Sequence, residues 1–357
     1  MALFNIGKPK AFLGVDIGTA GVKLVQLQEE HGRAKLHTYA YTERGPNETA
    51  TSLLDTPELT AGILKTMMKK AKTTATKVVT GLPISAIFSS VLSVPKLADK
   101  EQRGAIEVQA RKLISVPLEE MILDHKILTT PEEIKAAGDK LKNIKVLLTA
   151  APKSLVKKYM DVFKAAGLEL ASLETEAFAL IRALVGKDKS TLMIIDVGAL
   201  RTSVLVVMDG IPYLSRSIEV GGVRFTKAAA VALGVTDERA ESMKGDIRSF
   251  GALPEGGIPK VFEPVAVQIA NEIAFSLKLF AGLEEAQGKT VEKVILTGGG
   301  SLLPGLDAYL GQKLQLRVFR GDPWARVLYP EDARPLLDDI GPRYSVAVGL
   351  AMREFEK

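Results

Sequence analysis

The sequence of 357 residues contains no cysteine and only three histidines. Without cysteine the chain can form no disulfide scaffold, cysteine zinc site or iron–sulfur cluster, and it has no cysteine nucleophile. His31, His37 and His125 do not follow a metal-ligand spacing. Any chemistry of this chain therefore depends on carboxylates, hydroxyls, lysines, arginines and the backbone.

Long hydrophobic runs are also absent. The longest apolar stretch, Leu192–Met208, is interrupted by Asp196 and Arg201, whereas a membrane-spanning helix needs about 20 apolar residues. Near the amino end only the five residues 11–15 are apolar or glycine before an aspartate follows, which is too short for the core of a secretory signal. We therefore expect a cytoplasmic protein.

Neither charge sign is in large excess, since 47 Lys and Arg face 42 Asp and Glu, for a net charge of +5. The lysines are scattered, and a cluster such as 65–70 is typical of a solvated helix face. Nucleic-acid binding favours a denser basic stripe with interleaved aromatics, but aromatics are only 6% of this chain. We expect no nucleic-acid partner, while an anionic membrane surface or an acidic partner stays open.

What the sequence does contain is a repeated pattern of elements. The expected elements of the first part are strands at 12–16, 22–28, 35–42 and 77–82 and a helix at 57–72. A second series begins with a strand at 191–196, where Asp196-Val-Gly198 repeats Asp16-Ile-Gly18 at a displacement of 180 residues. This repeat predicts two similar α/β halves that arose by duplication, with a ligand cleft between them.

A separate small unit interrupts the first half. Its expected elements are strands at 87–94, 121–128 and 144–150 and a helix at 99–114, which form a βαββ module. We assign 84–148 to this inserted α+β domain, 1–83, 149–188 and 343–357 to the first half of the duplication, and 189–342 to the second half.

Three glycine-containing turns follow expected strands. The first contains Asp16, Gly18, Thr19, Ala20 and Lys23. Glycine lets backbone N–H groups approach a phosphate, Thr19 and Lys23 supply a hydroxyl and a cation, and Asp16 can hold a hydrated Mg²⁺. Taken alone, this segment is equally consistent with an ordinary β-turn.

The other two turns repeat this arrangement. The second contains Asp196, Gly198 and Thr202, and an aspartate at the end of an apolar strand needs a partner because an unpaired buried charge is costly. The third contains Gly298, Gly299, Gly300 and Ser301 after an expected strand at 293–297. Three consecutive glycines let the backbone approach a flat ring or a phosphate closely.

Together the three turns resemble the actin-like ATPase superfamily, which includes actin, sugar kinases, DnaK-type chaperones, FtsA and the PilM proteins. The resemblance implies an α/β, actin-like duplicated fold with a cleft for ATP or ADP between the halves, and it places Asp16 and Asp196 near Mg²⁺. It also implies that Glu241 and Lys244, which share a helix face, contact ribose and adenine. A surface ion pair is the plainer interpretation of these two residues.

Three further features belong to the same resemblance. Relatives place an acidic or amide residue beside the attacking water at the position of Glu176, although an acid at a helix N-terminus is also favoured by the helix dipole. Gly221 and Gly222 match a glycine pair of the second half that acts as a hinge or phosphate contact. Ala199 and Leu200 replace the acid and glycine that relatives such as actin carry, which argues against fast hydrolysis and leaves nucleotide binding intact.

Several segments resemble, more narrowly, the PilM family of type IV pilus systems. They are 81–83, 91–95, 105–110, 116–120, 148–153, 165–168 and 344–351. This resemblance implies an ATP-binding cytoplasmic scaffold of the inner-membrane assembly platform, whose nucleotide state is coupled to domain orientation. The implied partner is the N-terminal cytoplasmic tail of a PilN-like membrane protein, bound beside the insert near the helix at 99–114. Contact with the membrane would be indirect, and other pilus motor components or self-association stay open.

Two alternatives within the superfamily predict different features. An FtsA-like filament protein carries an amphipathic membrane helix after a linker, whereas we expect the final helix to run directly into 353–357. A small-molecule kinase needs a catalytic acid and a polar substrate pocket in the first half, and no convincing candidate lies outside the nucleotide turns. We expect an ATP-binding protein that is at most a slow ATPase.

Overall fold

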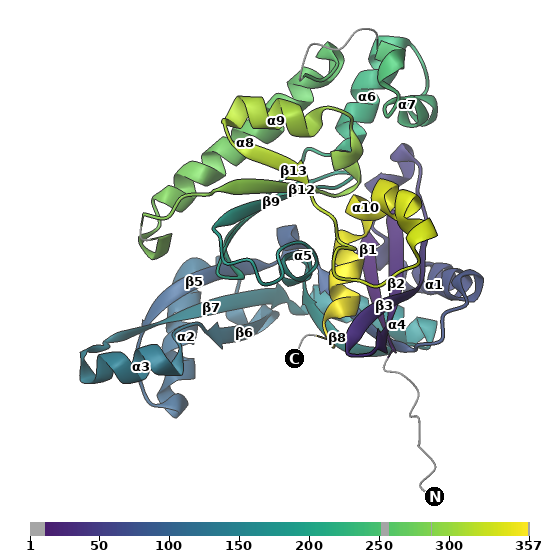
Figure 1. Ribbon diagram of the computed structural model, residues 1–357. Helices are drawn as coiled ribbons and strands as arrows, with labels where there is room; N and C mark the ends of the chain where they lie inside the picture. Colours follow the sequence, from purple (N-terminus) through teal and green to yellow (C-terminus); the bar gives the residue numbers. More distant parts are fainter. Residues whose placement is uncertain (1–10, 251–256, 287, 356–357) are drawn as a thin grey trace, which may run out of the picture.

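The computed structural model describes residues 11–250, 257–286 and 288–355 (Figure 1). Two five-stranded sheets organise the chain, and they have the same strand order. The first is β3 (Arg33–Tyr41), β2 (Gly21–Glu30), β1 (Ala11–Gly18), β4 (Lys77–Leu82) and β8 (Glu169–Thr175). The second is β11 (Ile211–Ile218), β10 (Thr202–Met208), β9 (Leu192–Val197), β12 (Lys293–Thr297) and β13 (Arg317–Arg320).

Strand directions repeat as well. In each sheet the first three strands are antiparallel, and the last two run parallel to the central strand. The central strand β9 is apolar along most of its length, and Leu192 to Ile195 are fully buried, because helices cover both faces of the sheet. The repeated order and direction confirm the predicted duplicated α/β fold.

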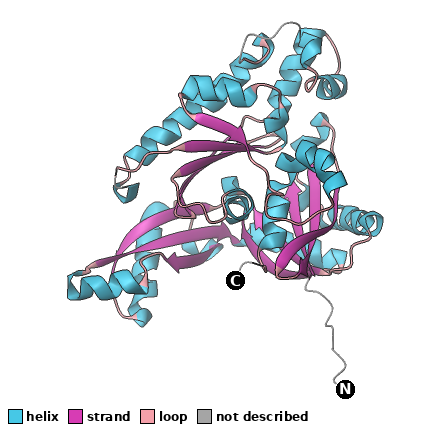
Figure 2. Cartoon of the chain, in the orientation of Figure 1, coloured by secondary structure: helices cyan, strands magenta, loops and turns pink. Residues whose placement is uncertain are grey.

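Helices cover both sheets in layers (Figure 2). Helices α1 (Pro57–Ala71) and α4 (Lys153–Ala166) pack on one face of the first sheet, and α10 (Arg334–Met352) packs on the other. Helices α6 (Gly222–Leu233), α8 (Glu263–Ala281) and α9 (Leu306–Leu314) cover the outer face of the second sheet. Helix α5 (Glu176–Leu184) packs on its inner face, and the short helix α7 (Asp237–Met243) lies beside α6.

The two halves meet where α5 crosses α10 (Figure 1). The helices approach so closely that a Cβ at Gly349 would lie 1.9 Å from the carbonyl oxygen of Ala179. Val346 and Leu350 of α10 belong to the same buried cluster as Ile194 of β9. The carboxyl-terminal helix therefore packs on the first sheet while also contacting the second.

The inserted segment forms its own sheet. Strands β5 (Phe88–Pro95), β7 (Asn143–Pro152) and β6 (Met121–Ile127) are antiparallel in the order β5-β7-β6, and α2 (Asp99–Leu113) packs on them. A short helix, α3 (Pro131–Ala137), lies between β6 and β7, and Thr130 and Glu133 form its capping box. No helix in the described ranges is both long and apolar enough to cross a membrane.

Candidate functional site

A cleft of about 760 Å³ lies between the ends of the two five-stranded sheets, a size typical of small-molecule sites. It brings together fourteen of the seventeen site residues predicted from the sequence. Those that line it are Asp16, Gly18, Thr19, Ala20, Lys23, Glu176, Asp196, Gly198, Gly222, Glu241, Lys244, Gly298, Gly299 and Gly300. Predicted residues up to 284 positions apart in the chain, Asp16 and Gly300, thus share one cavity.

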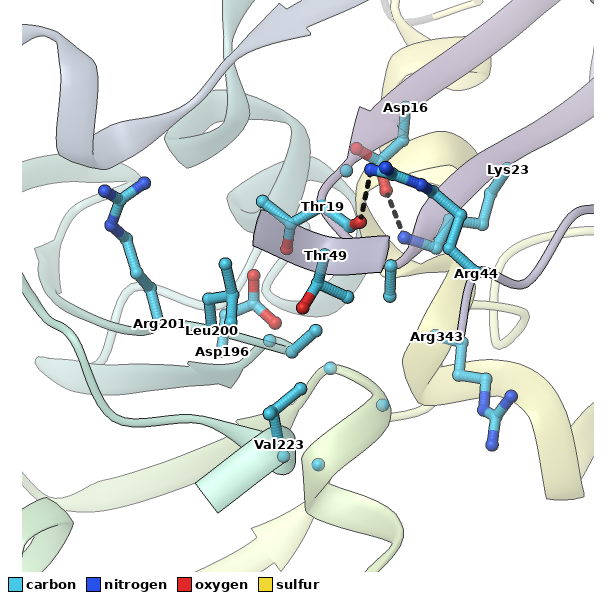
Figure 3. A pocket seen from close by; sticks show the side chains of 18 of the residues that line it. Asp16, Thr19, Lys23, Arg44, Thr49, Asp196, Leu200, Arg201, Val223 and Arg343 are labelled. Atoms are coloured by element: carbon cyan, nitrogen blue, oxygen red, sulfur yellow. Dashed lines mark hydrogen bonds and ion pairs between the residues drawn. The ribbon is translucent and has the colours of Figure 1, made fainter. Parts of the chain in front are cut away.

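The first turn is a tight hairpin between β1 and β2. Gly18 pairs with Gly21 across it, so that Thr19 and Ala20 form the tip, and Asp16 stands opposite Lys23. The Nζ of Lys23 lies 3.2 Å from a carboxylate oxygen of Asp16 (Figure 3). One cation and one carboxylate are therefore held side by side at the edge of the cleft.

The second and third turns meet at Asp196. A Cβ at Gly298 would lie only 2.2 Å from Oδ1 of Asp196, and Gly298 has a φ of +84°, so glycine is required there on two grounds. Burial, followed by the charge of Asp16, raises the pKa of Asp196 to about 6. Among the described residues nothing forms a hydrogen bond or ion pair with this carboxylate.

Glu176 begins α5 and also faces the cleft. Its Oε2 accepts a hydrogen bond of 3.2 Å from the backbone N–H of Ile84, in the short helix η3 (Ile84–Ala86) at the start of the insert. Burial, followed by the charges of Asp16 and Asp196, raises the pKa of Glu176 to about 8. Burial, followed by the charges of Glu176 and Asp16, also raises the pKa of the Tyr159 hydroxyl well above its ordinary value.

These carboxylates fit a bound cation. The charge of Asp16 raises the pKa of both Glu176 and Asp196, the charge of Asp196 adds to the effect on Glu176, and the cation Lys23 opposes both shifts. Within the described ranges no three acidic or histidine side chains are placed to ligate a metal directly. Mg²⁺ suits such a site because it keeps several waters and takes few carboxylates.

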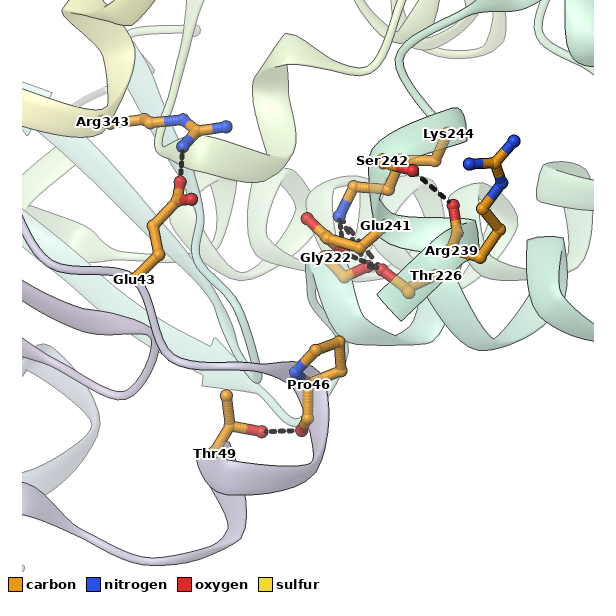
Figure 4. Close-up of polar contacts among 10 residues, drawn as sticks. All are labelled: Glu43, Pro46, Thr49, Gly222, Thr226, Arg239, Glu241, Ser242, Lys244 and Arg343. Atoms are coloured by element: carbon orange, nitrogen blue, oxygen red, sulfur yellow. Dashed lines mark hydrogen bonds and ion pairs between the residues drawn. The ribbon is translucent and has the colours of Figure 1, made fainter. Parts of the chain in front are cut away.

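On the second half, Glu241 and Lys244 form an ion pair of 2.6 Å at the cleft wall (Figure 4). The Nζ of Lys244 also donates to the hydroxyl of Thr226 at 3.1 Å, and that hydroxyl donates to Glu241. Burial lowers the pKa of Lys244, opposed by the charge of Glu241. The pair is thus a structured polar wall of the cleft and not a freely solvated surface pair.

Three predicted site residues do not line the cleft. Thr202 is fully buried and its hydroxyl donates to the carbonyl of Val220 at 2.7 Å. The hydroxyl of Ser301 donates to the carbonyl of Gly298 at 2.6 Å, and Gly221 packs where a Cβ would lie 2.6 Å from the carbonyl of Gly198. Each of the three residues thus shapes a turn behind the cleft, and their ligand contacts stay a prediction.

The structure also places in the cleft residues that carried no sequence signal. They are Arg44, Thr49, Tyr159, Arg201, Ser203, Val223 and Arg343, and Figure 3 labels the three arginines, Thr49 and Val223. Ser203 lies beside Asp196 because the two residues pair across β9 and β10 and directly opposed residues share a sheet face. Arg44 and Arg343 come from a polar loop and from the far end of the chain, so that only the fold brings them to this cavity.

One side-chain contact joins the two halves beside the cleft, and a second lies within the first half. The side-chain amide of Asn47, in the short helix η1 (Pro46–Ala50), donates to Glu238 of α7 at 3.1 Å. Arg343 of α10 pairs with Glu43 (Figure 4). Arg44 donates to the backbone carbonyls of Thr19 and Thr51 at 3.3 and 2.8 Å. These hydrogen bonds connect the segment around η1, which contacts α7, to the first turn.

Comparisons with known proteins agree with this architecture. A solved structure described as a PilM–PilN type IV pilus biogenesis complex is 26% identical, has a TM-score of 0.81, and covers 97% of this chain and 98% of its own. MreB5 of Spiroplasma citri bound to ADP is 16% identical with a TM-score of 0.53 over 97% of this chain and 96% of its own, which shows a shared fold.

Among curated relatives, the cell division protein FtsA of Bacillus subtilis is 24% identical over 270 residues, or 68% of this chain. The match spans 58% of the length of that relative. The family model for the type IV pilus assembly protein PilM matches residues 14–355. The chain therefore belongs to the PilM family of type IV pilus assembly proteins, with an actin-like fold.

Proposed function

We propose that this protein is a nucleotide-binding scaffold of the type IV pilus inner-membrane platform, which binds Mg²⁺ with ATP or ADP in the cleft and the cytoplasmic tail of a PilN-like membrane protein beside the insert. The observation that carries the nucleotide part is the convergence of three glycine turns on Asp16, Glu176 and Asp196, where the pKa of Glu176 and that of Asp196 are raised. A polyphosphate with a divalent cation satisfies both features, because backbone N–H groups bind phosphate and the metal compensates the carboxylates.

Each part of the cleft then has a role. Asp16 and Asp196 hold hydrated Mg²⁺, while Lys23 and the turn of Thr19 and Ala20 bind phosphate. Glu241 and Lys244 bind ribose and adenine. The glycine turns at 198 and 298–300 and the residue Gly222 let the backbone approach the nucleotide. The metal that accompanies the nucleotide compensates carboxylates whose negative charges otherwise repel one another, and the negative phosphates are bound by Lys23 and the backbone.

We infer slow hydrolysis at most. Among the residues that the structure describes, Glu176 is the one candidate to orient or deprotonate an attacking water, and with a pKa of about 8 it carries its proton at neutral pH in the nucleotide-free protein. Its hydrogen bond to Ile84 instead connects the cleft to the start of the insert. We therefore assign Glu176 to the coupling between nucleotide and the orientation of the insert.

The partner assignment follows the family. The similar solved structure is described as a complex with PilN, and we extend that partner to this chain, with its tail bound near α2. We retain the division into an insert at 84–148, a first half at 1–83, 149–188 and 343–357, and a second half at 189–342. In this arrangement the partner is the link to the membrane and nucleotide sets the orientation of the surface that binds it.

A titration with fluorescent ATP, with and without a synthetic PilN-type tail, tests the proposal. We expect binding at millimolar Mg·ATP, its loss in the double variant Asp16→Ala with Asp196→Ala, and its retention in Asp332→Ala with Asp338→Ala, two exposed acids outside the cleft. Absence of ATP binding by the wild type, or binding that survives the first double variant, refutes the site. Filaments that sediment without partner would favour an FtsA-like function, and phosphate release stimulated by a sugar would favour a kinase.

A further inference from the structure

The net charge of the chain is concentrated on one part of the first half. Residues 55–77 and 153–169, which contain α1 and α4 with their flanks, hold nine lysines and four acids, for a charge of +5. The whole chain also has a net charge of +5, so the remaining residues balance one another. Neither segment contains an arginine.

These lysines share one outer face. Helices α1 and α4 pack side by side on the side of the first sheet opposite α10 (Figure 1), and their inner sides are buried. On α4, Lys153, Lys157, Met160 and Lys164 are spaced as i, i+4, i+7 and i+11, which places them in a single stripe. The outward sides of both helices therefore form one continuous basic face.

Most of this charge is not neutralised within the protein. Three of the acids are paired: Asp55 with Lys158 at 2.5 Å, Asp161 with Lys157 at 2.5 Å, and Glu169 with Lys77 at 3.8 Å. Six lysines of the face form no ion pair with any described residue, and each is exposed. They are Lys65, Lys69, Lys70, Lys72, Lys153 and Lys164.

We propose that this basic face of α1 and α4 docks on the anionic headgroup layer of a phospholipid bilayer. Lysine is a compact point charge suited to a diffuse anionic surface, whereas nucleic-acid recognition draws on arginine forks and exposed aromatics. The aromatic rings of α4, Tyr159 and Phe163, are buried. The exposed apolar side chains on this face are instead Leu59, at 60% exposure, and Met160, at 56%, which can enter the interfacial layer.

This inference extends the proposed function, in which the membrane is reached only through a partner's tail. A tail holds the protein near the bilayer, and a basic face then sets which side of the first half is turned toward it. The two contacts act together because tethering makes the second contact effectively intramolecular. The face itself binds lipid without the tail, so the two ideas can be tested separately.

Vesicle sedimentation with the full-length protein tests the face. Vesicles of phosphatidylcholine with an equal amount of phosphatidylglycerol are compared with pure phosphatidylcholine, at low and high salt. The test variant is Lys65→Gln, Lys69→Gln, Lys70→Gln and Lys164→Gln. The matched control removes four exposed lysines elsewhere, Lys187→Gln, Lys227→Gln, Lys260→Gln and Lys278→Gln.

We expect the wild type to bind only the anionic vesicles and to be released by salt, since exposed charges are screened. At ~1 kcal/mol per lysine, or about fivefold each, the test variant should lose at least about tenfold in partition coefficient. The control should change by less than about twofold. Lys69 and Lys70 lie in the last turn of α1, so thermal unfolding verifies the fold, and Lys65→Gln with Lys164→Gln serves as a milder variant.

Failure of the wild type to bind anionic vesicles, or equal losses in the test and control variants, overturns the proposal. Tighter binding to a mixed-sequence DNA duplex at the same salt overturns it in favour of nucleic acid. Titrations of ATP and of the PilN-type tail with the test variant separate this outcome from the proposed function. Both titrations should match the wild type when only vesicle binding is lost.

Discussion

Gly298 offers a demanding test of the cleft, because two independent constraints exclude any other residue. Its φ of +84° lies in the left-handed region, and an added Cβ would meet Oδ1 of Asp196 at 2.2 Å and the carbonyl oxygen of Val197 at 2.5 Å. Gly210, at the tip of the hairpin between β10 and β11, has a similar φ of +74° with no atom within 4 Å of an added Cβ. Gly210→Ala is therefore a matched control that carries the backbone strain alone.

The expected magnitudes differ accordingly. A left-handed alanine costs roughly 1–2 kcal/mol, which both variants share. Forcing extra atoms into a packed site adds about 1–3 kcal/mol, and only Gly298→Ala meets that cost. We therefore expect Gly298→Ala to lower the free energy of unfolding by about 2–5 kcal/mol and Gly210→Ala by about 1–2 kcal/mol.

Urea unfolding followed by circular dichroism measures both values, and a titration with Mg·ATP measures the cleft. We expect Gly298→Ala to displace Asp196 and to abolish nucleotide binding in protein that is still folded, whereas Gly210→Ala binds as the wild type does. Equal stability of the two variants, together with unchanged ATP affinity in Gly298→Ala, would refute the reasoning about this turn.

Four further substitutions test other contacts. Unfolded Glu176 releases its proton near pH 4.5, but the folded protein keeps it to about pH 8. As the pH rises between these values, the wild type should therefore lose on the order of 2–4 kcal/mol of stability relative to Glu176→Gln. If urea unfolding shows the same difference between the two proteins at pH 5 and at pH 8, the reasoning is contradicted. Thr202→Val should cost about 1–3 kcal/mol of stability without changing ATP affinity. Ser203→Ala should instead weaken ATP binding without that loss of stability, and ATP titration and urea unfolding of both variants test this. Asn47→Ala, which removes the bond to Glu238, should speed nucleotide release in stopped-flow at a stability cost within about 0.5 kcal/mol; an unchanged release rate argues against a closing contact.

The duplicated fold could be predicted because local sequence patterns indicate it. Apolar strands that end in Asp-x-Gly are visible at 16–18 and at 196–198, and helix boundaries follow from capping residues and glycines such as Gly167. Strand β8 was missed because its sequence, Glu169–Thr175, mixes acids with apolar residues. Its place in the sheet comes from parallel pairing with β4, a contact between distant segments that no local pattern records.

The candidate cleft was also predictable only in part. The glycine turns could be predicted from the sequence, because a backbone that approaches a ligand closely tolerates no side chain. Which hydroxyl faces the cleft could not, since Thr202 and Ser203 are neighbours on β10 and only the placement of the strand decides which of them points inward. Arg44 and Arg343 carried no motif because each belongs to the site only through the packing of its element.

By itself the sequence determined which chemical groups are available to the site: aspartates, a lysine and glycine turns, with no cysteine chemistry and few histidines. Only the tertiary structure decided how strongly those groups act on one another. The pKa values of Glu176 and Asp196 are raised because burial and nearby carboxylates penalise ionisation, and both effects depend on distances between residues that are far apart in the chain. The basic face follows the same logic, because its lysines look scattered in sequence and become one surface only when α1 packs beside α4.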